Sequence, residues 1–165
     1  MVLFLDFDGV LHPTGAVMGQ NGPELAGYGS LFMWANPLAE LLATHSHVQI
    51  VLSTSWVRQM PLEQVRDFLP MPLRRRVIGA IWNQIQNDPT FSKGLPYSYW
   101  EDATRYQQVR RWVNVHRLRR WIALDDDADG WGDADRDRLV QVKGDTGLSD
   151  PLAMLRLSDL LRGQP

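Results

Sequence analysis

The stretch VLFLDFDGVLH, residues 2–12, joins a short apolar run to two aspartates and a glycine. Residues 2–5 lack the alternation of polar and apolar side chains that marks a half-exposed strand, so they predict a strand buried on both faces. Gly9 lets the chain turn directly after Asp6 and Asp8. Because ligands of open α/β sheets bind beyond the carboxyl ends of the strands, the two aspartates are candidate functional residues.

Four further apolar runs predict buried strands: VQIVL at 48–52, VIGAI at 77–81, WIAL at 121–124 and LVQV at 139–142. Helix-start signals fall between these runs, namely Asn36-Pro37, Pro61, Thr104 with Gln107 at capping-box spacing, and Asp150-Pro151. Strands that alternate with helices predict an α/β fold with a mostly parallel central sheet.

Length and composition restrict the organisation of the chain. We expect residues 1–165 to form a single domain, with a glycine-rich flap or hairpin at 13–33 and a long polar and aromatic insertion at 83–103. The absence of cysteine excludes disulfides, thiolate metal sites and a cysteine nucleophile. No apolar run approaches a membrane span, and MVLFLDFDG carries no cationic leader, so we expect a cytoplasmic protein without a membrane partner. No feature predicts a protein partner.

Two other predicted strands also end in polar residues. LSTSW places Ser53 and Thr54 after the second strand, and DDDADG places Asp125 and Asp126 after the fourth. The acidic stretch begins like a calcium EF-hand loop, but Arg136 stands where that loop needs a glutamate. If the strands are adjacent, carboxylates from distant parts of the chain converge and need a cation between them to stay ionised. Hard oxygen ligands favour Mg²⁺.

DFDGVLH strongly resembles the first motif, DxDG followed by Thr or Val, of the haloacid dehalogenase (HAD) superfamily of phosphohydrolases. LSTSW resembles the second motif, a Ser or Thr that closes the second strand, and DDD after WIAL resembles the acidic pair of the fourth motif. The resemblance follows the whole chain in order. It implies a Rossmann-like, three-layer α/β/α fold with a minimal cap, formed by the flap and the insertion.

The resemblance also implies roles for the acidic residues. Asp6 would attack phosphorus as the nucleophile and bind Mg²⁺. Asp8 would act as general acid and then general base, while its backbone carbonyl contacts the metal. Asp126, with Asp125 beside it, would complete the metal shell.

Two other roles each have two candidates. Thr54 fits the position of the phosphoryl ligand in the second motif and is favoured over Ser53. Arg105 lies at the head of the helix before the fourth predicted strand, where the superfamily more often has lysine, and it is favoured over Lys93 in the insertion. His12, just after the first motif, either faces the substrate or is a hydrogen-bonded structural histidine.

Superfamily members with little cap resemble enzymes that act on bulky phosphates. The layout here looks most like the HAD domain of bacterial RNA-repair proteins, which resembles the 3′-phosphatase half of polynucleotide kinase–phosphatases. The expected function is a Mg²⁺-dependent phosphomonoesterase acting on nucleic-acid 3′-phosphate ends or another bulky phosphate. Basic and aromatic residues are compatible with nucleic-acid binding or with ordinary surface and core positions; they are Arg74, Arg75, Arg76, Arg110, Arg111, Arg117, Arg119, Arg120, Trp56, Tyr97, Tyr99 and Trp100.

The alternative is a non-catalytic domain that accepts or binds a phosphoryl group on the same fold, like a response-regulator receiver. A receiver keeps its phosphorylated aspartate on the third strand, where this chain has VIGAIWNQ. Asp8 also supplies the acid and base that a long-lived aspartyl-phosphate would have to lack. A degenerate phosphate-binding domain is disfavoured by the intact carboxylates.

Overall fold

The computed structural model describes residues 1–20, 22–82 and 102–163. Our predictions for Lys93, Tyr97, Tyr99 and Trp100, and for most of the insertion, fall outside these residues.

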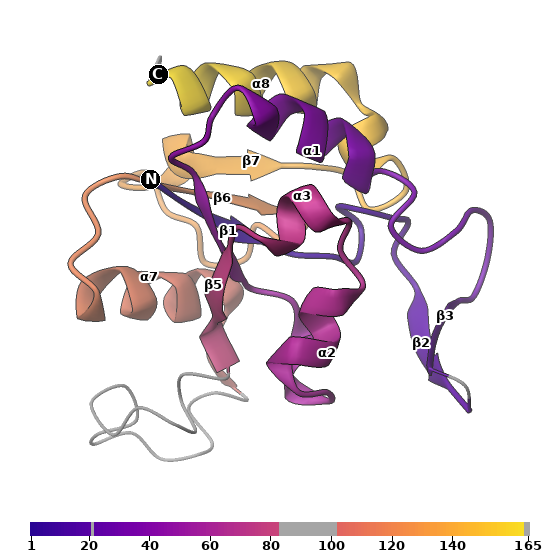
Figure 1. Ribbon diagram of the computed structural model, residues 1–165. Helices are drawn as coiled ribbons and strands as arrows, with labels where there is room; N and C mark the ends of the chain where they lie inside the picture. Colours follow the sequence, from indigo (N-terminus) through magenta and orange to yellow (C-terminus); the bar gives the residue numbers. More distant parts are fainter. Residues whose placement is uncertain (21, 83–101, 164–165) are drawn as a thin grey trace.

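A parallel sheet forms the centre of the molecule (Figure 1). Its five strands are β1 (Val2–Leu5), β4 (Gln49–Leu52), β5 (Val77–Ala80), β6 (Trp121–Asp125) and β7 (Leu139–Gln141). The spatial order is β5-β4-β1-β6-β7, and all four pairings are parallel. All five predicted strands are therefore present, each with ends within one residue of the prediction.

Helices cover both faces of the sheet. In Figure 1, α1 (Ala35–Ala43) and α8 (Pro151–Arg162) lie over one face, and α7 (Arg105–Val115) lies over the other. This arrangement confirms the three-layer α/β/α fold. The short helices α2 (Leu62–Asp67) and α3 (Met71–Arg74) connect β4 to β5, and α3 was not predicted.

Two of the predicted helix starts are confirmed in detail. The Thr104 hydroxyl accepts the N–H of Gln107, whose side chain accepts the N–H of Thr104, so the capping box of α7 is complete. Asp150 accepts the N–H of Leu152 at the start of α8. The predicted cap at Asn36 is wrong, because α1 begins at Ala35 without a side-chain cap. Pro37 still lies in the first turn, where no N–H bond is lost.

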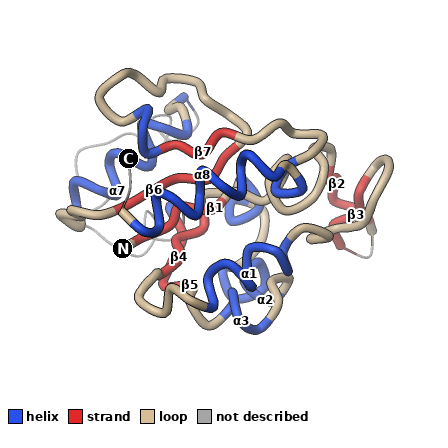
Figure 2. Tube along the Cα trace, turned by 90° about the horizontal axis from the view of Figure 1, so that it is seen from above, coloured by secondary structure: helices blue, strands red, loops and turns tan. Residues whose placement is uncertain are grey.

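A small antiparallel hairpin follows β1 and projects beyond one end of the sheet (Figures 1 and 2). Its strands are β2 (Ala16–Gly19) and β3 (Gly22–Leu25). The N–H of Thr14 donates to the carbonyl of Gly144 at 2.8 Å, which ties the base of the hairpin to the loop after β7. The hairpin predicted at 13–33 is therefore confirmed. No helix within the described residues is long and apolar enough to cross a membrane.

Candidate active site

The ends of three neighbouring strands form the candidate site. Leu5 at the end of β1 is in register with Leu52 of β4 and with Leu124 of β6. Beyond this register, the N–H of Asp6 donates to the carbonyl of Leu124 at 3.1 Å, and the N–H of Ser53 donates to the carbonyl of Leu5 at 2.9 Å. The convergence expected from the sequence is therefore present in the fold.

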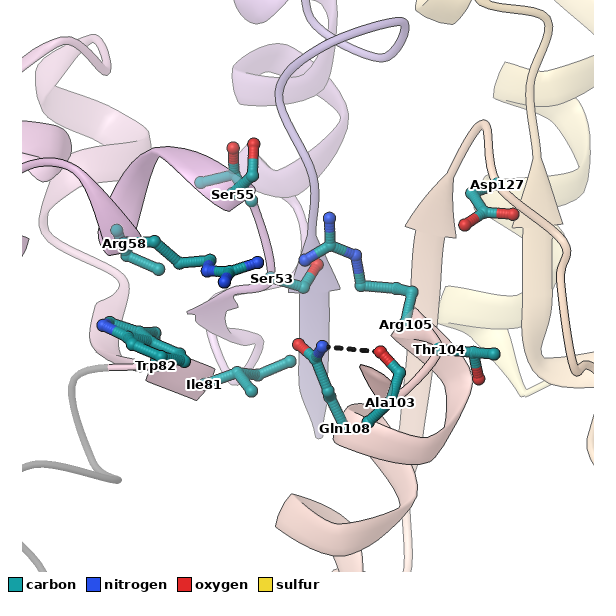
Figure 3. Close-up of a pocket in the computed structure, with 12 residues that line it drawn as sticks. Ser53, Ser55, Arg58, Ile81, Trp82, Ala103, Thr104, Arg105, Gln108 and Asp127 are labelled. Carbon is teal, nitrogen blue, oxygen red and sulfur yellow. Dashed lines mark hydrogen bonds between the residues drawn. The ribbon is translucent and has the colours of Figure 1, made fainter. Parts of the chain in front are cut away.

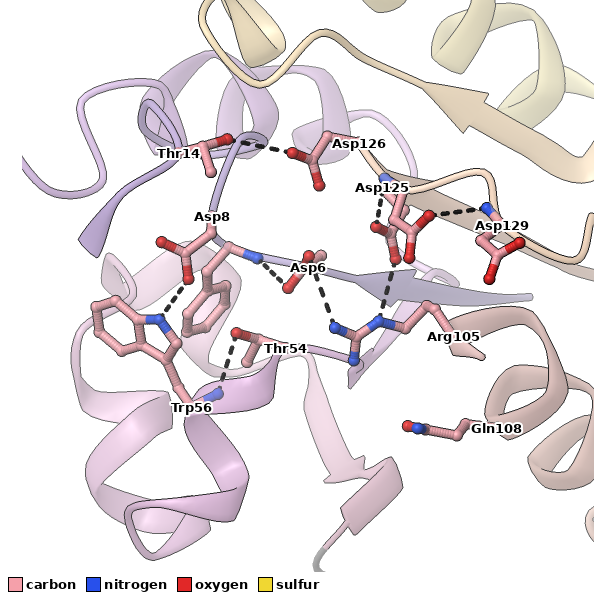
Figure 4. A network of polar contacts seen from close by, with 12 residues as sticks. Asp6, Asp8, Thr14, Thr54, Trp56, Arg105, Gln108, Asp125, Asp126 and Asp129 are labelled. Carbon is pink, nitrogen blue, oxygen red and sulfur yellow. Dashed lines mark hydrogen bonds and ion pairs between the residues drawn. The ribbon is translucent and has the colours of Figure 1, made fainter. Parts of the chain in front are cut away.

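Three carboxylates meet at this edge of the sheet (Figure 4). Asp6, Asp125 and Asp126 each offer an oxygen, and these oxygens lie within 4.8 Å of one another. Burial raises the pKa of Asp6 to about 6 and raises the pKa of Asp125 well above its usual range. Three carboxylates this close and this poorly solvated need a cation, and an all-oxygen set suits Mg²⁺. The donor set therefore fits the predicted metal.

Arg105, the first residue of α7, supplies a fixed positive charge beside the carboxylates. Its Nε lies 3.4 Å from Asp125 Oδ2, and its Nη2 lies 3.9 Å from Asp6 Oδ2. The Thr104 capping box sets the start of α7 and therefore the position of Arg105. Burial opposes the charge of the guanidinium, but the neighbouring carboxylates outweigh it and raise the pKa of Arg105 further. The side chain thus bridges two acidic residues as a cation.

The carboxylate of Asp8 lies outside the group of three. Its Oδ2 accepts the indole N–H of Trp56 at 2.7 Å, and its Oδ1 accepts the N–H of Ala16 at 3.2 Å. Burial acts to raise the pKa of Asp8, but the contacts with His12 and Trp56 outweigh burial and hold that pKa below its usual range. The Asp8 carboxylate therefore has partners of its own, separate from those of Asp6. Its roles in proton transfer and, through the backbone carbonyl, in metal binding stay predictions.

Ser53 and Thr54 line a cavity of about 200 Å³ next to Arg105 (Figure 3). Each of the two residues is 1% exposed. The Thr54 hydroxyl accepts the N–H of Trp56 at 3.4 Å, an arrangement that leaves its own O–H as a donor. Both residues share this cavity with Arg105, and their role as phosphoryl ligands, with Thr54 favoured over Ser53, stays a prediction.

Gly9 and Thr14 shape the metal side of the site. Gly9 has φ +68°, and a Cβ atom there would overlap the carboxylate of Asp126. The Thr14 hydroxyl lies 3.2 Å from both Asp126 Oδ2 and the carbonyl of Gly144, and can donate to either. The sequence predicted the turn at Gly9 but not this close approach, and no sequence signal pointed to Thr14.

Replacing Gly9 with alanine should weaken Mg²⁺ binding by about tenfold or more, since displacing a metal ligand through its neighbours has effects of that size. The added Cβ would push the Asp126 carboxylate aside and would sit in a strained left-handed conformation. Isothermal titration with Mg²⁺ would measure the change. Gly132→Ala is the matched control, because a Cβ at Gly132 would meet nothing within 4 Å. Equal affinities for the two variants would contradict this role of Gly9.

Of the two interpretations of Trp56, a stacking face and a core position, the structure supports the core position. Trp56 is 5% exposed, and its ring packs against Phe7, His12, Phe32 and Phe68. The tryptophan that follows the second motif therefore belongs to an aromatic cluster beneath the site. The indole N–H of Trp56, not its ring face, contacts the candidate site, at the carboxylate of Asp8.

Among the basic residues considered for nucleic-acid binding, Arg76 and Arg120 lie away from the site. Arg76 directly precedes β5 and Arg120 directly precedes β6, so both lie at the amino ends of strands whose carboxyl ends form the site. The Arg76 guanidinium donates to three carbonyls, those of Leu42, His45 and Val48. Arg110 on α7 pairs with Asp135 at 3.2 Å. These contacts indicate structural roles for Arg76 and Arg110.

Comparison with known proteins gives one family match. The model of the family described as "HAD domain in Swiss Army Knife RNA repair proteins" matches residues 2–153, which include all five strands of the sheet. Neither the search of curated proteins nor the search of solved structures found a match.

Proposed function

The chain belongs to the family of HAD domains found in Swiss Army Knife RNA repair proteins, and from that membership we propose a Mg²⁺-dependent phosphomonoesterase that works through an aspartyl-phosphate. The family supports a phosphatase-like function of the HAD type. The observation that carries the finer proposal is the position of Asp6. It directly follows the central strand, β1, and meets two further carboxylates and the Arg105 guanidinium.

The first half-reaction would use Asp6 and Asp8 together. A carboxylate oxygen of Asp6 attacks phosphorus as the bond to the leaving oxygen breaks. The negatively charged phosphate opposes the ionised form of Asp8, so Asp8 takes up a proton when the substrate binds and gives it to the leaving oxygen. Arg105 stabilises the charge that develops on the phosphoryl oxygens, and Thr54 or Ser53 donates a hydrogen bond to one of them. Mg²⁺, held by Asp6, Asp125 and Asp126, would supply further positive charge when bound; those three residues are its ligands in this proposal.

The second half-reaction returns the site to its starting state. Water attacks the phosphorus of the Asp6 aspartyl-phosphate, and Asp8, now a carboxylate, accepts a proton from that water. The P–O bond to Asp6 breaks, which releases inorganic phosphate and restores the Asp6 carboxylate.

Phosphate release from 4-nitrophenyl phosphate, with Mg²⁺ and with excess chelator, tests the proposed reaction. We expect turnover only with Mg²⁺. A stable phosphoprotein that releases no phosphate would instead favour the alternative, a phosphoryl-accepting regulatory domain.

For the physiological substrate we propose nucleic-acid 3′-phosphate ends. The support comes from the RNA-repair description of the family. We expect a 3′-phosphorylated oligonucleotide to be hydrolysed with a kcat/KM at least about tenfold above that of a mononucleotide or a sugar phosphate, since each added contact of about 1.4 kcal/mol gives that factor. A matched 5′-phosphorylated oligonucleotide is the control. Equal rates on all four would exclude this substrate class.

A further inference from the structure

Three N–H groups face the Asp8 carboxylate, and Figure 4 shows the one from Trp56. The Trp56 indole donates to Oδ2 at 2.7 Å, and the backbone N–H of Ala16 donates to Oδ1 at 3.2 Å. The Nε2 atom of His12 lies 3.5 Å from the same Oδ1. Both oxygens of Asp8 therefore face fixed donors, which restrict the carboxylate to one orientation.

The tautomer of His12 follows from its other contact. The backbone N–H of Phe32 donates to His12 Nδ1 at 3.4 Å, so the proton of a neutral ring is on Nε2. His12 is 0% exposed, and its Nε2 has no hydrogen-bond partner among the described residues. A buried N–H without a partner is costly, and here it faces Asp8. A shift of a few tenths of an ångström would complete a bond to the carboxylate.

The backbone N–H that contacts His12 belongs to a residue in a strained conformation. Phe32 has φ +59°, a left-handed conformation that is unfavourable for a non-glycine residue. Its N–H reaches His12 in this conformation, and its ring packs against both His12 and Trp56. The residue that orients His12 next to Asp8, Phe32, therefore has a strained backbone.

We propose that Trp56 and His12 are positioning residues that hold the Asp8 carboxylate in the orientation needed for proton transfer to the leaving oxygen. This inference rests on the proposed phosphatase function. The side chain of Asp8 is 24% exposed. It opens on a cavity of about 60 Å³ between the β2–β3 hairpin and the turn at Ser55–Arg58, with Met18 and Gln59 in its walls. The leaving group would approach Asp8 from this cavity.

The dependence of the rate on the leaving group separates this role from a general effect on the fold. β-Glycerol phosphate has a poor leaving group that needs a proton, whereas 2,4-dinitrophenyl phosphate needs almost none. We expect Trp56→Phe, which removes the N–H and keeps an aromatic ring, to lower kcat/KM for the alkyl ester by about tenfold or more. The kcat/KM for the dinitrophenyl ester should change by less than about twofold, because its leaving oxygen does not depend on Asp8. Equal losses on both esters would overturn the proposal.

Control variants test each contact. Trp112→Phe removes another buried indole N–H, one without a hydrogen-bond partner among the described residues, and should leave the ratio of the two rates unchanged. In an Asp8→Asn background, Trp56→Phe should cause no further loss on the alkyl ester. His12→Gln keeps an N–H near the Nε2 position and should retain more alkyl-ester activity than His12→Asn. Additive losses in the double variant, or equal activities of the two His12 variants, would contradict the proposal.

An NMR measurement tests the hydrogen bond between Trp56 and Asp8 independently of catalytic activity. The indole N–H signal of Trp56, assigned by its loss in Trp56→Phe, should move upfield in Asp8→Ala because the 2.7 Å bond to a carboxylate is gone. An unchanged signal would overturn the positioning role even in an active enzyme. A shifted signal in a protein that releases no phosphate would refute the proposed function while leaving the contact established.

Discussion

Asp6→Asn should lower phosphate release by at least about a thousandfold, because an amide cannot replace the carboxylate as nucleophile. The loss should appear in kcat with aryl and alkyl esters alike, since both require attack on phosphorus. Steady-state release of inorganic phosphate measures it, and ³²P labelling of the protein during turnover should disappear in parallel. Substantial turnover by Asp6→Asn would exclude the aspartyl-phosphate route.

The same variant should be more stable than the wild type in the absence of metal. The pKa of Asp6 is about 6 in the folded protein and 3.8 in an unfolded chain, so the folded state retains the proton more strongly. The resulting stability is present below pH 3.8 and is lost as the pH rises through 6. At pH 8 the difference between the two pKa values corresponds to a loss of about 3 kcal/mol in the free energy of unfolding. The neutral asparagine would avoid this loss. Thermal melts at pH 8 with chelator would show the gain, and a lower melting temperature for Asp6→Asn would contradict it.

Arg105→Met should lower kcat/KM by about a hundredfold to a thousandfold, the range found when one stabilising donor is removed from a reacting oxyanion. It would also leave the buried Asp6 and Asp125 without their shared positive partner. Arg105→Lys should lose less, about tenfold, because an ammonium group keeps the charge but cannot bridge two carboxylates as a planar guanidinium does. Steady-state kinetics of the two variants on one substrate would give both values.

Lys93→Met is the matching experiment, because Lys93 was the other candidate for the basic residue that stabilises the phosphoryl group. We expect it to retain most of the wild-type kcat. A larger loss with Lys93→Met than with Arg105→Met would transfer the role from Arg105 to Lys93.

The core of the fold and the acidic site were predictable because they depend on short-range signals. A strand that is buried on both faces must be apolar throughout, so β1 and β6 can be recognised from four or five residues of sequence. The parallel arrangement then brings their carboxyl ends together, and with them Asp6 and Asp125. Arg105 followed from the Thr104 capping box, which fixes a helix start locally.

Contacts that do not follow from the order of the strands were not predictable. Thr14 meets Asp126 only because the base of the hairpin is tied to the loop after β7. For Trp56 both a stacking surface and a core position were compatible with the sequence, and nothing in LSTSW reveals that its N–H faces Asp8. The start of α1 was misplaced because Asn36 looks like a cap, whereas packing of Ala35 and Leu38 into the core sets the helix. In each case tertiary packing decided the outcome.

The central place of β1 in the sheet has a consequence during synthesis. One neighbour of β1, β4, leaves the ribosome soon after it, but the other, β6, follows more than a hundred residues behind β1. At roughly 5–20 residues per second, one edge of an entirely apolar strand waits on the order of ten seconds for its partner. The unpaired edge of β1 is therefore prone to pair with a wrong strand in that interval. The need for a chaperone to cover it should end when residues 121–125 emerge.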